Sequence, residues 1–171
     1  MTPMRMTPPI VRVRNLFAEM HRDIGTLPLL VVLTGSPGTG KTHSGTRLFG
    51  FAIACAGLQR GKAPTAKWTT GFQATHQIKY AGSEFMRQWA FFAEPQFLFL
   101  DDVFTEKTTE TDVHLVAELI ETRKNALKRT IVTTNKTLID FERLSARLAE
   151  RMLEDAEIIA FSGPSMRLES A

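Results

Sequence analysis

Residues 29–42 read Leu-Leu-Val-Val-Leu-Thr-Gly-Ser-Pro-Gly-Thr-Gly-Lys-Thr, and this stretch decides the fold. An apolar run of strand length comes first. The pattern G-x-x-x-x-G-K-[ST], from Gly35 to Thr42, follows it directly and is typical of loops that cradle phosphates. Glycines let the loop backbone take left-handed angles, so that its N–H groups turn inward around an anion. The sequence therefore predicts a strand, a phosphate-binding loop, and a helix whose N-terminus adds a positive dipole.

Each part of this loop has an expected role in binding a triphosphate. The Lys41 ammonium is expected to reach the β- and γ-phosphates, and the Thr42 hydroxyl to ligate Mg²⁺. The backbone cradle is expected from the other loop residues, which are Gly35, Ser36, Pro37, Gly38, Thr39 and Gly40.

Bulk composition is that of an ordinary globular domain. The chain has 171 residues, 43% of them hydrophobic and 23% charged, and a net charge of +3, which does not by itself indicate a nucleic-acid partner. Cys55 is the only cysteine, so no intrachain disulfide is possible, and its apolar helical surroundings predict a core position. With no apolar run of membrane-spanning length and no signal-peptide core near the start, we expect a cytoplasmic protein without a membrane partner.

Strands and helices are expected to alternate from residue 29 to residue 161. The predicted strands are 29–34, 66–70, 97–102, 130–135 and 156–161, and the predicted helices are 41–57, 71–92, 112–125 and 141–152. This alternation predicts a five-stranded parallel sheet with right-handed crossovers, in a three-layer α/β sandwich. Phe85, Trp89 and Phe92 are expected to form a buried stripe rather than a base-stacking platform.

The first 28 residues are expected to form an N-terminal arm, and residues 29–171 the main domain. Pro8-Pro9 is expected to resist helix formation, with a short helix from Asn15 to Ile24. Arginines outnumber acids in this arm. A solvated arm with a packing helix is one interpretation, and a contact to a neighbouring subunit, to DNA or to a partner is the other.

Two further strands end in polar side chains. The buried run Phe97–Leu100 leads into Asp101 and Asp102, and the run from Thr130 ends at Asn135. Because the carboxyl ends of parallel strands meet at one edge, we expect these groups to surround a γ-phosphate. Asp101 is expected to hold Mg²⁺, Asp102 to orient or deprotonate the attacking water, and Asn135 to hydrogen-bond that water or the phosphate.

Arg143, Arg147 and Arg151 recur every four residues and so share one helix face. A solvated face with acids nearby is one interpretation of this spacing. The other is that one arginine reaches a phosphate held by a neighbouring subunit, as an arginine finger does.

Taken in order, these motifs resemble the AAA+ ATPases, in particular the compact DnaC/IstB-like group of helicase loaders and transposase helpers. The resemblance spans roughly residues 29–168. Gly35–Thr42 followed by His43 is similar to the G-K-T-H start of that group, and Phe97–Asp102 looks like its Walker B strand. Thr133-Thr134-Asn135 resembles sensor 1, and residues 144–152 and 163–167 resemble its paired arginines and its closing G-P-S-x-R.

This resemblance implies an AAA+ ATPase with ATP and Mg²⁺ as cofactors and a homo-oligomer with shared ATP sites. His43 joins the expected nucleotide-binding residues. Arg151 becomes the expected arginine finger, with Arg147 as the lesser candidate, and Arg167 is expected to sense the nucleotide. The chain departs from the group in its short N-terminal segment, in little or no helical lid, and in having Asp102 where most AAA+ proteins have glutamate.

The expected function is ATP hydrolysis in DNA replication as a helicase loader that binds single-stranded DNA and a replicative helicase. The basic segments 60–67 and 123–129 are the expected DNA contacts. A transposase helper shares every motif. An ATP-dependent assembly module with little hydrolysis is a third possibility, which Asp102 permits. A small-molecule kinase fits the size, but Asn135 and the arginine helix argue against it.

Overall fold

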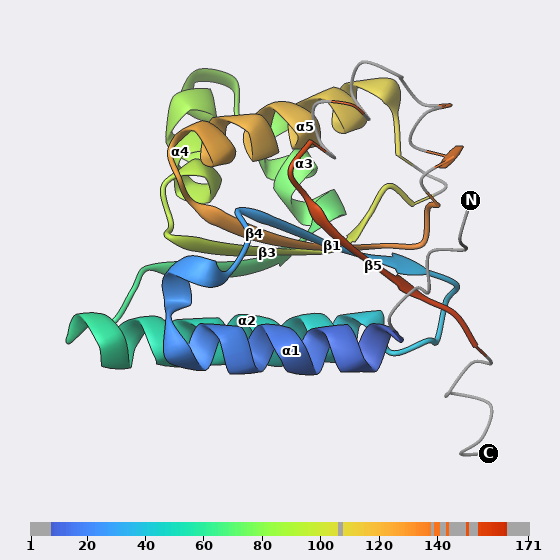
Figure 1. The fold of residues 1–171 in the computed structure, drawn as a ribbon. Helices are drawn as coiled ribbons and strands as arrows, with labels where there is room; N and C mark the ends of the chain where they lie inside the picture. The colour runs from blue at the N-terminus through green and yellow to red at the C-terminus, as the bar shows by residue number, and fades with distance from the viewer. Residues whose placement is uncertain are drawn as a thin grey trace.

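A five-stranded parallel sheet lies between two layers of helices in the computed structural model, which describes residues 8–105, 108–137, 139–140, 143, 150 and 154–163 (Figure 1). The strands are β1 (Leu30–Gly35), β2 (Ala66–Thr70), β3 (Phe97–Val103), β4 (Arg129–Thr134) and β5 (Glu157–Phe161). Their order in the sheet is β2-β3-β4-β1-β5, and every neighbouring pair is parallel. The predicted three-layer α/β fold is confirmed.

Helices cover both faces of the sheet. Figure 1 shows α1 (Pro9–Arg22) and α2 (Lys41–Arg60) on one face, and α3 (Gly71–Lys79), α4 (Phe85–Ala93) and α5 (Glu110–Asn125) on the other. Two short 3-10 helices, η1 (Ile24–Thr26) and η2 (Gly82–Glu84), connect these elements. Each face has its own apolar cluster, and the central strands contribute alternate side chains to the two. The segments Leu30–Leu33 of β1 and Phe97–Leu100 of β3 are therefore apolar throughout rather than alternating in polarity.

Helix α1 starts six residues earlier than the sequence suggested. Pro9 is its first residue, where a missing N–H costs no hydrogen bond and the fixed φ of proline suits the helix. The expectation that Pro8-Pro9 would keep this segment non-helical is therefore wrong. Val13, Leu16 and Met20 are buried against α2 and the sheet, so α1 packs into the same core as β1 and β5.

The segment 71–92 is not one helix. It breaks at η2, where Gly82 has a φ of 52°, into α3 and α4. Phe92 is fully buried as predicted, but Phe85 is 40% exposed, so the expected buried stripe is only partly present. Cys55 is buried in α2, which confirms its core position, and burial raises the pKa of its thiol.

Arg123 in α5 is fully buried, although the sequence placed it in a basic, DNA-contacting segment. Its guanidinium donates to the carbonyls of Phe92, Ala93 and Pro95, as well as to Arg129 O and Thr130 Oγ1, at 2.7–3.1 Å. Burial lowers its pKa to about 10, still far above neutral, so the group remains charged at pH 7. Arg123 therefore ties α4, α5 and β4 together and is not available to DNA.

Candidate nucleotide-binding site

The phosphate loop lies between the end of β1 and the start of α2. Gly38 and Gly40 have φ values of 80° and 88°, which side chains with a Cβ rarely adopt. A Cβ on Gly35 would lie 2.0 Å from the carbonyl oxygen of Phe161, so only glycine fits between β1 and β5 there. Thr39 closes the loop, since its hydroxyl donates to Ser36 O at 2.8 Å.

Lys41 is the first residue of α2 and points into the loop. Its Nζ donates to the carbonyls of Gly35 and Ser36, each at 2.7 Å, and the residue is only 7% exposed. The ammonium is thus held at the centre of the turn, where a bound triphosphate would meet it.

Thr42, Asp101 and Thr133 form the next group. Thr42 Oγ1 donates to Asp101 Oδ1 at 2.9 Å, and Thr133 Oγ1 donates to the same oxygen at 2.5 Å. Asp101 is 8% exposed and lies at the carboxyl end of β3, beside the start of α2. A carboxylate and a hydroxyl are hard oxygen ligands, so these residues fit a Mg²⁺ ion.

Asp102 and Asn135 lie together at the same edge of the sheet. Asn135 Nδ2 donates to Asp102 Oδ1 at 3.1 Å, and both residues are exposed. The backbone N–H of Asp102 donates to Thr133 Oγ1 at 2.8 Å. Hydrogen bonds therefore link Thr42, Asp101, Thr133, Asp102 and Asn135 in one continuous series, beside the loop that holds Lys41.

A cleft of about 400 Å³ continues from the loop between α1 and α2. Thr39, Gly40 and His43 line it beside the loop, and Phe161 lines it from β5. The wall opposite comes from α1, through Ile10, Val13, Arg14 and Phe17. The expectation of an N-terminal arm over residues 1–28 did not include this wall, although the spacing i, i+3, i+4, i+7 of these four residues is that of one helix face.

The profile of the IstB-like ATP binding proteins matches residues 29–171. This chain belongs to that family. The fold of this IstB-like domain is similar to the crystal structure of the DnaC helicase loader (19% identity, 94% of each chain covered, TM-score 0.69). It is also similar to the crystal structure of DnaI (17% identity, 93% of this chain and 88% of that one, TM-score 0.66).

A third similar structure is the replication initiator DnaA bound to AMPPCP and single-stranded DNA (20% identity, 88% of this chain and 45% of that one, TM-score 0.65). No curated protein matches the sequence. Together these comparisons confirm the resemblance drawn from the motifs, and they show an ATP-binding AAA+ domain of the DnaC/IstB type.

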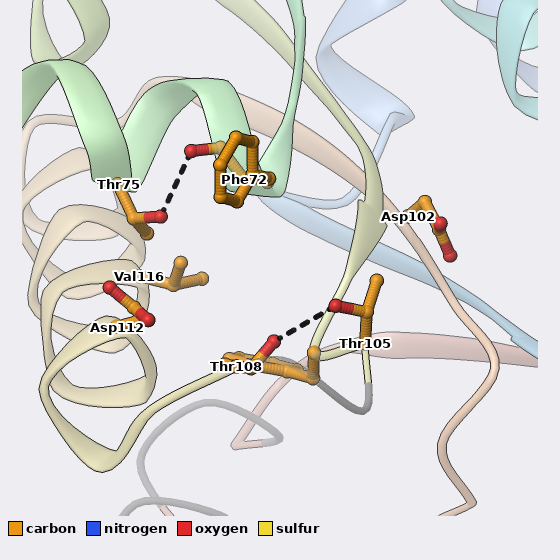
Figure 2. Close-up of a pocket in the computed structure, with 9 residues that line it drawn as sticks. Phe72, Thr75, Asp102, Thr105, Thr108, Asp112 and Val116 are labelled. Carbon is orange, nitrogen blue, oxygen red and sulfur yellow. Dashed lines mark hydrogen bonds between the residues drawn. The ribbon is translucent and has the colours of Figure 1, made fainter.

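A small pocket of about 20 Å³, lined in part by Asp102, lies between α3 and α5 in this IstB-like domain (Figure 2). Phe72 and Thr75 line it from α3, and Asp112 and Val116 line it from α5. Asp102 thus lines this pocket and also contacts Asn135 after β4. No sequence motif indicated this pocket, because it forms between elements far apart in the chain.

Arg147, Arg151 and Arg167 lie outside the described residues, so their expected roles remain predictions. Within the described ranges, no group of three or more histidine, cysteine, aspartate or glutamate side chains is arranged to hold a metal ion. None of the helices described is long and apolar enough to cross a membrane.

Proposed function

We propose that this IstB-like chain hydrolyses ATP with Mg²⁺ and acts in DNA replication as a helicase loader that binds single-stranded DNA and a replicative helicase. The observation that carries the proposal is the hydrogen-bonded series from Thr42 through Asp101 and Asp102 to Asn135, beside the Lys41 loop. A nucleotide-binding domain that only holds ATP needs the loop, whereas hydrolysis also needs groups that orient water.

The cleft and the loop together fit a nucleoside triphosphate. The triphosphate lies along the loop from Gly35 to Thr42, and the base and ribose lie in the cleft between α1 and α2, against Phe161. The Arg12 guanidinium anchors α1 beside this cleft, since it donates to the Glu157 carboxylate at 2.6 and 3.0 Å. That pairing raises the pKa of Arg12 above its ordinary value.

In the hydrolytic step, the chain's own groups position the γ-phosphate and the water. Thr42 and Asp101 would hold a magnesium ion, which would neutralise charge on the phosphate oxygens. Asp102 accepts the proton of the attacking water, and Asn135 holds the Asp102 carboxylate while its amide also reaches the water. Lys41 stabilises the charge that develops on the phosphates.

The site is completed by a second copy of the chain. Arg151 of the neighbouring subunit reaches the γ-phosphate, Arg147 is the lesser candidate, and Arg167 senses the bound nucleotide. Support for this arrangement comes from the family pattern and from the exposure of Asp102 and Asn135, which face away from the core.

Single-stranded DNA binds along α3 in this proposal. Phe72, His76 and Tyr80 recur every four residues and form an aromatic ladder, with ring centroids 5.6 and 4.8 Å apart. Phe72 and Tyr80 are 66% and 70% exposed, and residues 59–83 contain no acid. Exposed rings on a basic segment are suited to stacking with unpaired bases. Because Phe72 and Asp102 line the same pocket, DNA on the ladder lies next to that pocket (Figure 2).

The test is ATP hydrolysis with and without single-stranded DNA. We expect DNA to raise the wild-type rate and Lys41→Ala to abolish both ATP binding and hydrolysis.

The double change Phe72→Ala/Tyr80→Ala is expected to weaken DNA binding about tenfold or more, because each stacked base contributes about 1–3 kcal/mol. Leu58→Ala, an exposed apolar residue on the opposite face of the sheet, is the matched control. Equal DNA affinity in all of these variants would refute the proposed DNA surface.

A transposase helper is the second candidate, because the matched family is the IstB-like one. The two roles share every residue described above and differ only in the partner. Specific capture of a replicative helicase by the full chain supports the first role, and specific capture of a transposase supports the second.

A further inference from the structure

Thr133 lies between the two acids of the site and contacts both. Its Oγ1 donates its only proton to Asp101 Oδ1 at 2.5 Å and accepts the backbone N–H of Asp102 at 2.8 Å. The residue is 1% exposed, so water does not compete for these contacts. One hydroxyl therefore bonds to two consecutive residues that have different expected tasks.

The backbone of β3 explains why this hydroxyl is needed. Leu100 pairs with Val132 and Val103 pairs with Thr134, so β3 has one more residue than β4 over this interval. This is a β-bulge at Asp101 and Asp102, and Asp102 has a φ of 52°. A bulge leaves backbone groups without their ladder partners, and Thr133 Oγ1 supplies the partner for the Asp102 N–H.

Packing keeps the Thr133 hydroxyl in place. Its methyl carbon Cγ2 would lie 3.2 Å from a Cβ on Gly45, so the methyl group packs closely against α2. Branching at Cβ restricts the side chain to few rotamers, and moving the methyl out of this contact would also move the hydroxyl. The orientation of Oγ1 is thus set by the distance between β4 and the helix that carries Thr42.

We infer that Thr133 is a positioning residue that orients Asp101 toward Mg²⁺ and Asp102 toward the attacking water at the same time. This inference rests on the proposed ATPase function. Asn135 is the residue of this strand segment expected to meet the phosphate or the water, whereas Thr133 acts only through the two acids. Removing its hydroxyl frees the Asp101 carboxylate and leaves the Asp102 N–H without its partner.

Three variants separate this role from a purely structural one. Thr133→Val keeps both the branching and the methyl contact with Gly45 but has no hydroxyl. Thr133→Ser keeps the hydroxyl and loses the methyl. Thr134→Val removes a buried hydroxyl from the neighbouring residue, which donates to Val103 O at 2.8 Å and contacts neither acid. Each full-length variant is compared by thermal unfolding, by titration with a fluorescent ATP analogue at a series of Mg²⁺ concentrations, and by ATP turnover.

We expect Thr133→Val to need about ten- to 100-fold more Mg²⁺ for half-maximal nucleotide binding and to lose turnover by a similar factor, the range found when a partner of a metal ligand is removed. Affinity for the nucleotide without Mg²⁺ should not change. Thr133→Ser should shift the Mg²⁺ dependence much less than Thr133→Val, because it keeps the hydroxyl and loses only the methyl contact that orients it. Thr134→Val should lose stability without shifting the Mg²⁺ dependence.

Two outcomes overturn the inference. One is a wild-type Mg²⁺ dependence in Thr133→Val, and the other is an equal shift in Thr133→Ser and Thr133→Val, which would assign the effect to packing. Failure of the wild-type chain to bind the ATP analogue at all would instead refute the proposed function, and this inference with it. Wild-type binding combined with an unaffected valine variant refutes this inference alone.

Discussion

At the scale of single residues, the left-handed backbone at Asp102 suits an aspartate at the position where the AAA+ resemblance implies glutamate. Asp102 has a φ of 52°, a region that aspartate and asparagine adopt more readily than other residues with a Cβ. The bulge also changes the direction in which the side chain leaves the strand. Its carboxylate is close enough to Asn135 for a 3.1 Å hydrogen bond, so the shorter side chain still reaches the residue proposed as the sensor.

Asp102→Asn is the most direct test of the proposed role of Asp102 in ATP hydrolysis. Asparagine tolerates the same backbone angle, so the fold and ATP binding should persist, while loss of the general base should slow turnover by about 100-fold or more. Single-turnover hydrolysis and ATP titration measure the two effects separately. Asp155→Asn is the matched control, because Asp155 has a similar φ of 59° and precedes β5, at the sheet edge opposite the phosphate loop. Equal turnover in the Asp102 variant and the wild type would show that Asp102 is not the general base. Slow wild-type turnover with intact ATP-driven oligomerisation would instead favour an assembly module with little hydrolysis.

At the scale of elements, Arg123 holds α4, α5 and β4 through carbonyl groups rather than through an acid. The carbonyls of Phe92 and Ala93 belong to the last turn of α4, where the helix dipole is negative. A buried guanidinium with five donated hydrogen bonds is stable there, because its charge is distributed over several oxygens.

We therefore expect Arg123→Met to lower the free energy of unfolding by about 3–5 kcal/mol, since it leaves several buried carbonyls unpaired. Arg123→Lys should recover only part of this loss, because an ammonium lacks the planar fork of donors. Urea unfolding of both variants gives the comparison. Arg87→Met in α4, where the side chain of Arg87 is 75% exposed, should change stability by less than about 0.5 kcal/mol. A similarly small change in Arg123→Met would show that the guanidinium does not hold these elements together.

The elements that the sequence predicted well are those whose signals are local. The strand 97–102 begins with the uninterrupted apolar run Phe97–Leu100, and the strand 130–135 is rich in β-branched residues. Reciprocal hydrogen bonds between Thr137 and Asp140 form a capping box. The predicted start of α1 was wrong because Pro8-Pro9 was expected to prevent a helix, whereas proline is allowed at the first helical position.

The features that the sequence did not reveal depend on tertiary contacts. Arg123 looks like part of a solvated basic helix end until the carbonyls of α4 are known to lie beside it. The bulge at Asp101 and Asp102 likewise follows from the register of β3 against β4, and neither strand shows it alone. Convergence of Thr42, Asp101 and Asn135 was predictable because parallel strands end at one edge, whereas the role of Thr133 between the acids was not.

At the scale of the whole molecule, every candidate catalytic group among the described residues lies at one edge of the sheet. The loop after β1, the acids of β3 and Asn135 after β4 share this edge, and Asp102 and Asn135 are exposed there. A neighbouring molecule therefore has access to this edge, as the proposed arginine from a second copy requires.

Mixing two inactive variants tests whether Arg151 acts between subunits. Lys41→Ala lacks a working loop but carries the arginine, and Arg151→Ala carries the loop without the arginine. Each alone should lose nearly all turnover, since an arginine finger accelerates phosphoryl transfer by about 10³–10⁵. If ATP lies between subunits, the mixture should recover a measurable fraction of wild-type hydrolysis, because some interfaces then pair an intact loop with an intact arginine.

An arginine that served its own subunit would give no recovery, and wild-type turnover in Arg151→Ala alone would exclude the residue from catalysis. Arg87→Met mixed with Lys41→Ala is the control for simple dilution, since Arg87→Met should retain its own activity at every ratio.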